Sequence, residues 1–350
     1  MDLDNLAKYQ EIDRSNMLAE LQGLPGQLKD AWNLGLSYSL PINNRISSLI
    51  IAGMGGSAMG ADLLASYVAP ICPIPILTLR DYRLPAWVHG PDSLVVASSH
   101  SGNTEETLSV FQQALENKCN LMVISTGGKL AKKAQENSLP LWTFTHHGQP
   151  RAAVGYSFGL LLALAVKLNL LPDQGVFVDS AVKAMQKMQE SIDLNVPIKK
   201  NIAKRMAGQL MNHWITVIGS DFLSPIARRY KTQINELAKA WAQFEFLPET
   251  DHNTLAGIEE SEEVLSKMFV LFLSASSDHP RNQLRTRLTR EEFMRAGINT
   301  DVLEFKEVDP LAEIWSSLIF GDYLSYYLAI AYQIDPTPID SIQNLKKSMQ

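Results

Sequence analysis

The first half of the chain alternates short apolar runs with segments whose apolar residues recur at helical spacing. Short apolar runs bounded by turn residues indicate buried strands, and apolar positions three or four residues apart indicate amphipathic helices. Strands that alternate with helices are typical of a doubly wound parallel sheet, so we expect an α/β fold. The predicted order is strand 47–52, helix 58–68, strand 74–79, strand 93–98, helix 104–117, strand 120–125, helix 129–136 and a short strand near 141–144.

The same pattern returns in the second half of the chain. Apolar runs at Trp214–Ser220 and Met268–Ser274 end in serines, and a further strand is expected over Thr300–Phe305. Such self-similarity indicates two tandem α/β domains of one type. We therefore expect N-terminal helices in residues 1–40, a first domain in 41–155, a helical connector in 156–205, a second domain in 206–332 and a C-terminal helical tail in 333–350.

Helices are also expected outside the two sheets. Residues Leu6–Leu36 have helical spacing that is interrupted at Gly23–Gly26, which predicts two helices that pack on the first domain. The longest apolar stretch, Phe158–Val166, is well short of the ~20 residues that a bilayer-spanning helix needs. We interpret it as a buried helix, and we expect no membrane partner.

Two strand-to-helix turns in the first half are rich in glycine and in short hydroxyl side chains. The strand at 93–98 leads into the run 99–107, and the strand at 47–52 leads into the run 53–60. Unpaired backbone N–H groups and the helix dipole favour an anion at a helix N-terminus, and glycine lets the backbone approach a ligand closely. The second domain lacks both runs, so one phosphate site per chain is expected. Its predicted ligands are Gly55, Gly56, Ser57, Ser99, Ser101 and Thr104.

Other interpretations of the glycine turn remain open. Any open α/β sheet needs Gly, Ser and Thr at its turns and helix caps. Gly53, Gly55 and Ala58 also fit the G-x-G-x-x-A fingerprint of dinucleotide-binding domains, with only Asp81 placed to bind a ribose. A Walker A loop is excluded, because the nearest match, residues 127–130, lacks a hydroxyl residue after its lysine.

Composition restricts the class of protein. The 350 residues are 46% hydrophobic and have a formal net charge of −6, which suits two soluble domains and argues against nucleic acid as a partner. The two cysteines, Cys72 and Cys119, lie in apolar or helical contexts and indicate neither a disulfide nor a cysteine metal site. The histidines lack metal-ligand spacing, so we predict no metal. Because no signal-peptide pattern is visible, we expect a cytoplasmic protein.

Three residues outside the turns are candidates for chemistry. Arg151 lies between the first sheet and the long apolar helix, where its guanidinium can meet an oxyanion. Glu236 falls in a helical pattern, and His252 falls in a polar loop. A glutamate on a helix is most often a solvated surface residue, and a loop histidine is a candidate because its pKa permits proton transfer near neutrality. Taken singly, each is a weak signal.

Together with the two turns, these residues resemble one family. The chain resembles the bifunctional phosphoglucose/phosphomannose isomerases, sugar isomerases with two SIS (sugar isomerase) domains. The resemblance covers nearly the whole chain in the family's order. The matching segments are Gly53–Ser57, Ser99–Glu105, Pro150–Arg151, Asn235–Glu236, Asp251–Asn253, Asp335–Pro338 and Leu345–Lys347.

The resemblance implies reversible isomerisation of glucose 6-phosphate or mannose 6-phosphate to fructose 6-phosphate. It implies that His252, helped by Lys346, opens the sugar ring, and that Glu236 transfers a proton between C2 and C1 through a cis-enediolate. Arg151 is implied to stabilise the enediolate charge. Thr337 is implied to leave room for rotation about the C2–C3 bond, so that one base serves both sugars. The resemblance implies no cofactor, and it implies a homodimer with a shared active site.

The chain departs from the family pattern at two positions. Leu237 stands where the family often has asparagine, and His100 stands where tyrosine is frequent. Both departures bear on the pocket wall and on the preferred sugar. Three alternatives to a glucose and mannose phosphate isomerase remain: another SIS-type phosphosugar isomerase, a phosphosugar-sensing protein that does not need Glu236 and His252, and a dinucleotide-dependent oxidoreductase.

Overall fold

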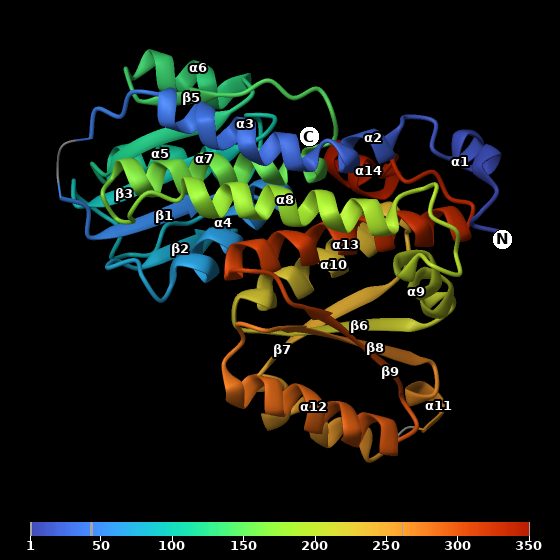
Figure 1. Cartoon of the computed structure of the whole chain (residues 1–350). Coiled ribbons are helices and arrows are strands. Elements are labelled where there is room, and N and C mark those ends of the chain that lie inside the picture. The colour runs from blue at the N-terminus through green and yellow to red at the C-terminus, as the bar shows by residue number, and fades with distance from the viewer. Residues whose placement is uncertain (1, 43–44, 261, 350) are drawn as a thin grey trace. The chain divides into compact units, whose positions relative to one another are not determined.

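The computed structural model describes residues 2–42, 45–260 and 262–349 (Figure 1). The chain divides into two compact units, and each has its own parallel sheet flanked by helices. The first-sheet unit comprises Gly23–Val182. The second-sheet unit comprises Met1–Gln22 and Lys183–Gln350.

The first sheet has five parallel strands in the order β2-β1-β3-β4-β5. Every strand and helix predicted between residues 47 and 144 is confirmed, with small shifts at the ends. The two central strands are buried along their whole length, which explains why the sequence shows them as continuous apolar runs. The elements are β1 Ser48–Ala52, α4 Gly55–Val68, β2 Ile76–Leu79, β3 Ser93–Ser99, α5 Glu105–Glu116, β4 Asn120–Ser125, α6 Gly128–Glu136 and β5 Leu141–Thr143.

Two helices of the first-sheet unit approach each other through small residues. Helix α3 (Leu24–Ser37) lies against α7 (Val154–Lys167), which contains the predicted buried stretch. A Cβ atom added at Gly159 would lie 2.7 Å from the Ala31 Cβ atom, which is closer than real Cβ contacts. Glycine at this position therefore lets the two backbones come together.

The second sheet repeats the strand order of the first. Its four parallel strands run β7-β6-β8-β9, which matches β2-β1-β3-β4 when strands are counted along the chain. The predicted tandem arrangement is confirmed. Strand β7 was not predicted, because only its first and last residues are buried and it offers no apolar run. The elements are β6 Trp214–Ser220, α10 Ser224–Leu237, β7 Ala242–Leu247, β8 Met268–Ala275, α12 Pro280–Arg295 and β9 Asn299–Phe305.

The N-terminal segment differs from its prediction. It forms three helices, not two, and the additional break falls at residues 13–16. There, the Asp13 carboxylate accepts a hydrogen bond from the backbone N–H of Met17 at 2.8 Å, a local contact that competes with helix. Pro25 lies in the first turn of α3, where proline is tolerated, so residues 23–26 interrupt the chain only briefly. Only α3 belongs to the first-sheet unit, whereas α1 (Leu6–Ile12) and α2 (Met17–Gln22) belong to the second.

Helix α13 (Pro310–Ala331) is the central helix of the second-sheet unit. Its residues from Leu311 to Ala331 are all buried, as in a helix that is surrounded by protein on every side. Helix α10 packs on it. The remaining helices are α8 Gly175–Ile192, α9 Ile202–Leu210, α11 Glu262–Leu265 and α14 Asp340–Ser348.

A buried ion pair joins α10 to α13. Arg229 Nε lies 3.0 Å from Asp322 Oδ1, and Arg229 Nη2 lies 2.7 Å from Asp322 Oδ2. The exposed fractions of the two side chains are 2% and 1%. This two-point geometry fixes the orientation of both side chains as well as their separation. The pair therefore sets how α10 lies on α13.

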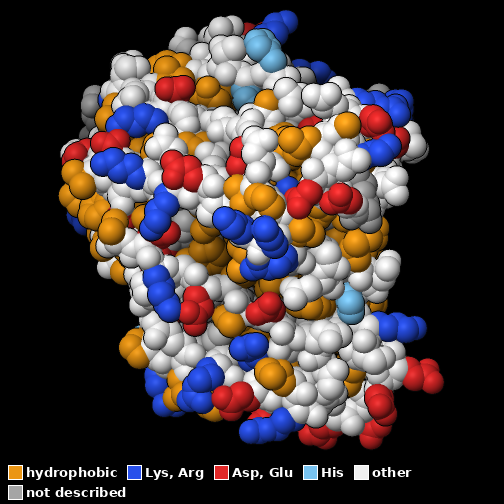
Figure 2. Space-filling model, turned by 45° about the vertical axis from the view of Figure 1, so that its right-hand side comes forward, with side chains coloured by type: hydrophobic (Ala, Val, Ile, Leu, Met, Phe, Trp, Pro, Cys, Tyr) orange, Lys and Arg blue, Asp and Glu red, His pale blue; other side chains and the backbone are white. Residues whose placement is uncertain are grey.

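The surface shows mixed charge. On the face drawn in Figure 2, lysine and arginine side chains are interspersed with aspartate and glutamate. Among the described residues, no helix is both long enough and apolar enough to cross a bilayer.

We expect Asp322→Ala to lower the free energy of unfolding by about 3–5 kcal/mol, because it leaves the Arg229 charge buried without its carboxylate. Urea unfolding measures this. As a control, Glu291→Ala removes an exposed i,i+4 partner of Arg287 and should cost less than about 1 kcal/mol. Equal costs for the two substitutions would show that the Arg229–Asp322 pair does not fix α10.

Candidate functional site

The first sheet has a switch point between β1 and β3. From β1 the chain passes through α4 to β2 on one side, and from β3 it passes through α5 to β4 on the other. In open α/β sheets, ligands bind beyond the carboxyl ends of the strands at such a point. Helix α4 begins at Gly55 and α5 at Glu105, so two helix N-termini with unpaired N–H groups follow these neighbouring strands.

The glycine turn lies inside a helix. Helix α4 begins three residues before its predicted start, so Gly55, Gly56 and Ser57 form its first turn. A Cβ atom added at Gly56 would lie 2.5 Å from the carbonyl oxygen of Pro150, so only glycine fits there. Ser57 is nearly buried, and its hydroxyl accepts a hydrogen bond from the backbone N–H of His100 at 3.3 Å. That contact joins the glycine turn to the serine turn.

The serine turn is held by its own hydroxyl groups. Ser99 Oγ lies 2.8 Å from Thr104 Oγ1 and accepts a hydrogen bond from the N–H of Gly102 at 3.1 Å. Gly102 has a φ of +64°, and a Cβ atom there would lie 1.8 Å from the Gly127 carbonyl oxygen. Ser101 is exposed beside them. Hydroxyl groups and helix N–H groups in this arrangement suit an oxyanion.

Arg151 borders the same region through its backbone. It lies in the 3-10 helix η1 (Pro150–Ala152), directly before α7, and is only 4% exposed. Its Nη1 atom donates to Gln149 Oε1 at 3.3 Å. Because Gly56 packs against Pro150, the first turn of α4 and the backbone of Arg151 lie side by side. The structure thus brings together the predicted phosphate ligands and Arg151 within the first-sheet unit.

An imidazole pair adjoins the serine turn. His100 Nε2 and His146 Nδ1 are 3.0 Å apart, and the aromatic rings of Phe144 and Tyr156 pack around them. Burial, and secondarily His146, lower the pKa of His100 to about 4. Burial also lowers the pKa of His146, with a smaller effect from His147. His100 is therefore uncharged at neutral pH. Sequence reasoning missed His146, because nothing local links it to residue 100.

Glu236 lines a pocket in the second-sheet unit. It is half-buried in the last turn of α10, and the pocket has a volume of about 500 Å³. Leu237, where the chain departs from the family pattern, is fully buried in the core, and the described lining does not include it. The other lining residues are Asn235, Lys239, Ile334, Asp335, Pro338, Ile339, Asp340, Ser341 and Ile342. Glu236 thus borders a concave site, which is where small-molecule ligands bind.

Lys239 connects two segments that line this pocket. Its Nζ atom donates to the backbone carbonyls of Glu236 (2.9 Å), Leu237 (3.2 Å) and Asp335 (3.0 Å). The first two are carbonyls at the C-terminus of α10, where a cation is stabilised by the helix dipole. The ammonium group therefore joins the end of α10 to the segment Asp335–Pro338. A lysine just past a helix end is a sequence signal for such a cap, which sequence reasoning missed.

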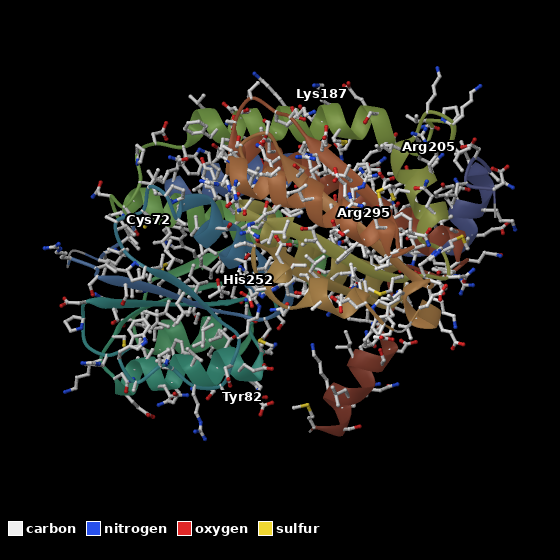
Figure 3. All side chains as sticks on the ribbon, turned by 90° about the horizontal axis from the view of Figure 1, so that it is seen from below. Cys72, Tyr82, Lys187, Arg205, His252 and Arg295 are labelled. Carbon is white, nitrogen blue, oxygen red and sulfur yellow. The ribbon has the colours of Figure 1, made fainter. Side chains whose placement is uncertain are left out.

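The other candidates of the second-sheet unit lie on separate elements. His252, labelled in Figure 3, is exposed at the end of the 3-10 helix η3 (Glu249–His252). Thr337 is 9% exposed, and Lys346 is exposed in the last turn of α14. The described lining of the Glu236 pocket includes neither His252 nor Lys346.

Cys72 and Cys119 are free, half-buried thiols. Within residues 2–42, 45–260 and 262–349, no group of three or more His, Cys, Asp or Glu side chains is placed to hold a metal ion.

Comparison with known proteins gives consistent matches. A family model described as the bacterial phospho-glucose isomerase C-terminal SIS domain matches residues 199–349. A bifunctional phosphoglucose/phosphomannose isomerase from Caldicellulosiruptor bescii is 38% identical over 337 residues, which cover 95% of this chain and 98% of that protein. Another from Aquifex aeolicus is 31% identical over 303 residues, covering 86% and 90%.

A solved structure shares the fold. The C-terminal domain of glucosamine-fructose-6-phosphate aminotransferase from Francisella tularensis matches with a TM-score of 0.73 and 16% identity. The match covers 92% of this chain and 98% of that one.

We expect the His100 environment to make the protein acid-sensitive. Because the folded-state pKa of about 4 is below the unfolded value near 6.5, its contribution to stability is present above pH 6.5 and is lost as pH falls toward 4. His100→Phe keeps the ring packing and cannot titrate. The free energy of unfolding should therefore fall less in His100→Phe than in the wild type between pH 7 and pH 5. The expected difference is about 1 kcal/mol, allowing for solvent screening of a partly exposed ring. Parallel pH dependences would contradict this.

Proposed function

Because the chain belongs to the bifunctional phosphoglucose/phosphomannose isomerase family, we propose that it interconverts glucose 6-phosphate and mannose 6-phosphate with fructose 6-phosphate. Family membership rests on the 38% identity that extends over 95% of the chain. The observation that supports the activity best is a half-buried glutamate in a concave site, in a chain that also has a hydroxyl-rich switch point. A binding protein for the same sugars would need only the second of these.

We assign the phosphate group to the first-sheet unit. The proposed ligands are hydroxyl and N–H groups of the two turns, in which Ser99 and Thr104 are already in contact and Ser57 accepts from the serine turn. The phosphate is remote from C1 and C2, so these groups contribute to substrate binding more than to turnover. The full set is Gly55, Gly56, Ser57, Ser99, Ser101 and Thr104.

We assign the proton transfer to Glu236. Its carboxylate takes the proton from C2 of the open-chain aldose and returns it to C1, while the hydroxyl proton passes from O2 to O1. The carbonyl thereby moves from C1 to C2, and no step changes the oxidation state of the whole molecule. No redox cofactor is needed, since the proton moves between adjacent carbons. Arg151 is proposed to stabilise the negative charge of the enediolate, a role that suits a buried guanidinium.

Three further residues complete the proposal. His252 protonates the ring oxygen to open the sugar, with help from Lys346, and both side chains are exposed as an approach by substrate requires. Thr337 is proposed to leave room for rotation about the C2–C3 bond. It lies beside Pro338, which lines the Glu236 pocket.

We also propose that the protein acts in the cytoplasm as a homodimer whose active sites are shared, as the family resemblance implies. The domain limits predicted from the sequence, 41–155 and 206–332, are retained as part of this proposal. The compact units are larger, because each includes flanking helices.

Purified protein should form fructose 6-phosphate from glucose 6-phosphate and from mannose 6-phosphate when each is supplied alone. A coupled assay of fructose 6-phosphate measures this. Glu263→Gln, which changes an exposed glutamate of the same unit, should keep full activity and serves as a matched control for Glu236→Gln, which should have none. No product from either sugar would contradict the proposal. Activity on another phosphosugar alone would assign the chain to a different isomerisation.

Ser101→Ala combined with Thr104→Ala should raise KM for both sugars at least tenfold and lower kcat less, because the lost contacts are to the unreactive phosphate. Steady-state kinetics on the two substrates measures the split. Ser37→Ala, on the exposed end of α3, is the control. An unchanged KM would remove these hydroxyls from the phosphate site.

A further inference from the structure

The second sheet has its own switch point, between β6 and β8, because it repeats the strand order of the first. Strand β8 ends at Ala275, and Ser276 and Ser277 follow it as His100 and Ser101 follow β3. In the first sheet this place holds the proposed phosphate ligands. The topology therefore predicts a second anion site here, although the sequence run that marks the first one is missing.

The donors at this second place are occupied by a carboxylate of the chain itself. The N–H of Ser276 donates to Glu313 Oε1 at 2.9 Å, and the N–H of Ser277 donates to Oε2 at 3.3 Å. The hydroxyl of Ser276 also donates to Oε1. Glu313 comes from the first turn of α13 and is 0% exposed. A buried carboxylate that accepts three hydrogen bonds from one loop is held as a bound anion would be.

Further carboxylates surround the loop. Asp278 is 3% exposed, and its Oδ2 atom accepts a hydrogen bond from the N–H of Ala275 at 2.7 Å. Asp221 accepts one from the N–H of His279 at 2.8 Å. Burial raises the pKa of Asp278 to about 7, and the charges of Asp221 and Glu313 add to the increase. A second anion would meet this negative charge at close range.

We propose that the Glu313 carboxylate is an internal anion that fills the second cradle, by which we mean the N–H groups of Ser276 and Ser277 and the Ser276 hydroxyl group. A phosphate monoester is then bound by the first cradle alone, the hydroxyl and N–H groups of the two turns that follow β1 and β3. With the carboxylate removed, the loop of Ser276 and Ser277 would bind inorganic phosphate or a phosphate monoester.

The effect of Glu313 on substrate binding rests on the proposed function. The substrate has one phosphate group, so a chain with two equal cradles would bind it in two ways. Glu313 removes one of these binding modes. It is thus a specificity-determining residue that does not touch the substrate.

The test uses a full-length background in which the first cradle is weakened by Ser101→Ala and Thr104→Ala. Glu313→Ala and Asp278→Asn are added to it, the second to reduce repulsion while keeping an oxygen acceptor for Ala275. Thermal unfolding is followed at pH 7 with inorganic phosphate and with KCl at equal ionic strength. Phosphate at ten times its Kd should raise Tm by about 3 °C more in the variant than in the background.

Two controls distinguish the space that the Glu313 side chain fills from the negative charge that it carries. Glu313→Gln, in place of Glu313→Ala, keeps the volume of the side chain and should show no additional phosphate response. Ser276→Ala, added to the responsive variant, should reduce the response. If the Glu313→Ala variant is unfolded in KCl, phosphate should restore its far-UV circular dichroism.

A folded variant without an additional Tm rise, or an unfolded one that phosphate does not restore, would overturn the inference. The readout does not use isomerisation. Failure of the proposed activity would therefore leave a positive phosphate response unchanged, and a negative response would leave the activity assay unchanged.

Discussion

The buried pair between Arg229 and Asp322 is the contact on which the proposed proton-transfer site depends. Arg229 precedes Glu236 by about two turns of α10, and Asp322 lies on α13, which leads to the segment Asp335–Pro338. The pair sets one helix on the other, and Lys239 then joins the C-terminus of α10 to the segment that follows α13. Burying two charges is costly, and the gain is a single arrangement of the helices. The pocket beside Glu236 follows from that arrangement.

The two sheets share one order of corresponding strands but differ in the contacts at their switch points. At the first switch point, hydroxyl and N–H groups of two turns surround a place that suits a phosphate. At the second, the corresponding donors hold Glu313. The difference depends on a residue from α13 and on short loops, while the order of the corresponding strands is the same.

The sequence predicted the sheets better than it predicted the contacts between distant residues. Both central strands of the first sheet were visible because they are apolar on both faces, whereas β7 was missed because most of it is partly exposed. The turn residues were visible because glycine and serine cluster locally. The sequence pattern did not indicate a role for Glu313 or Asp322. Each lies in a continuous apolar helix, and its role depends on a contact with a residue that is distant in the sequence.

Exchange of the C2 proton with solvent reports directly on the assignment of Glu236 as the base. Fructose 6-phosphate formation and loss of the C2 proton signal are followed by NMR in D2O for the wild type, Glu236→Gln and His252→Ala. We expect exchange in the wild type and none in Glu236→Gln. His252→Ala should keep part of its rate on open-chain substrate, because the base is still present. Continued exchange in Glu236→Gln, or equal failure of both variants on open-chain substrate, would contradict the assignment of Glu236 as the base.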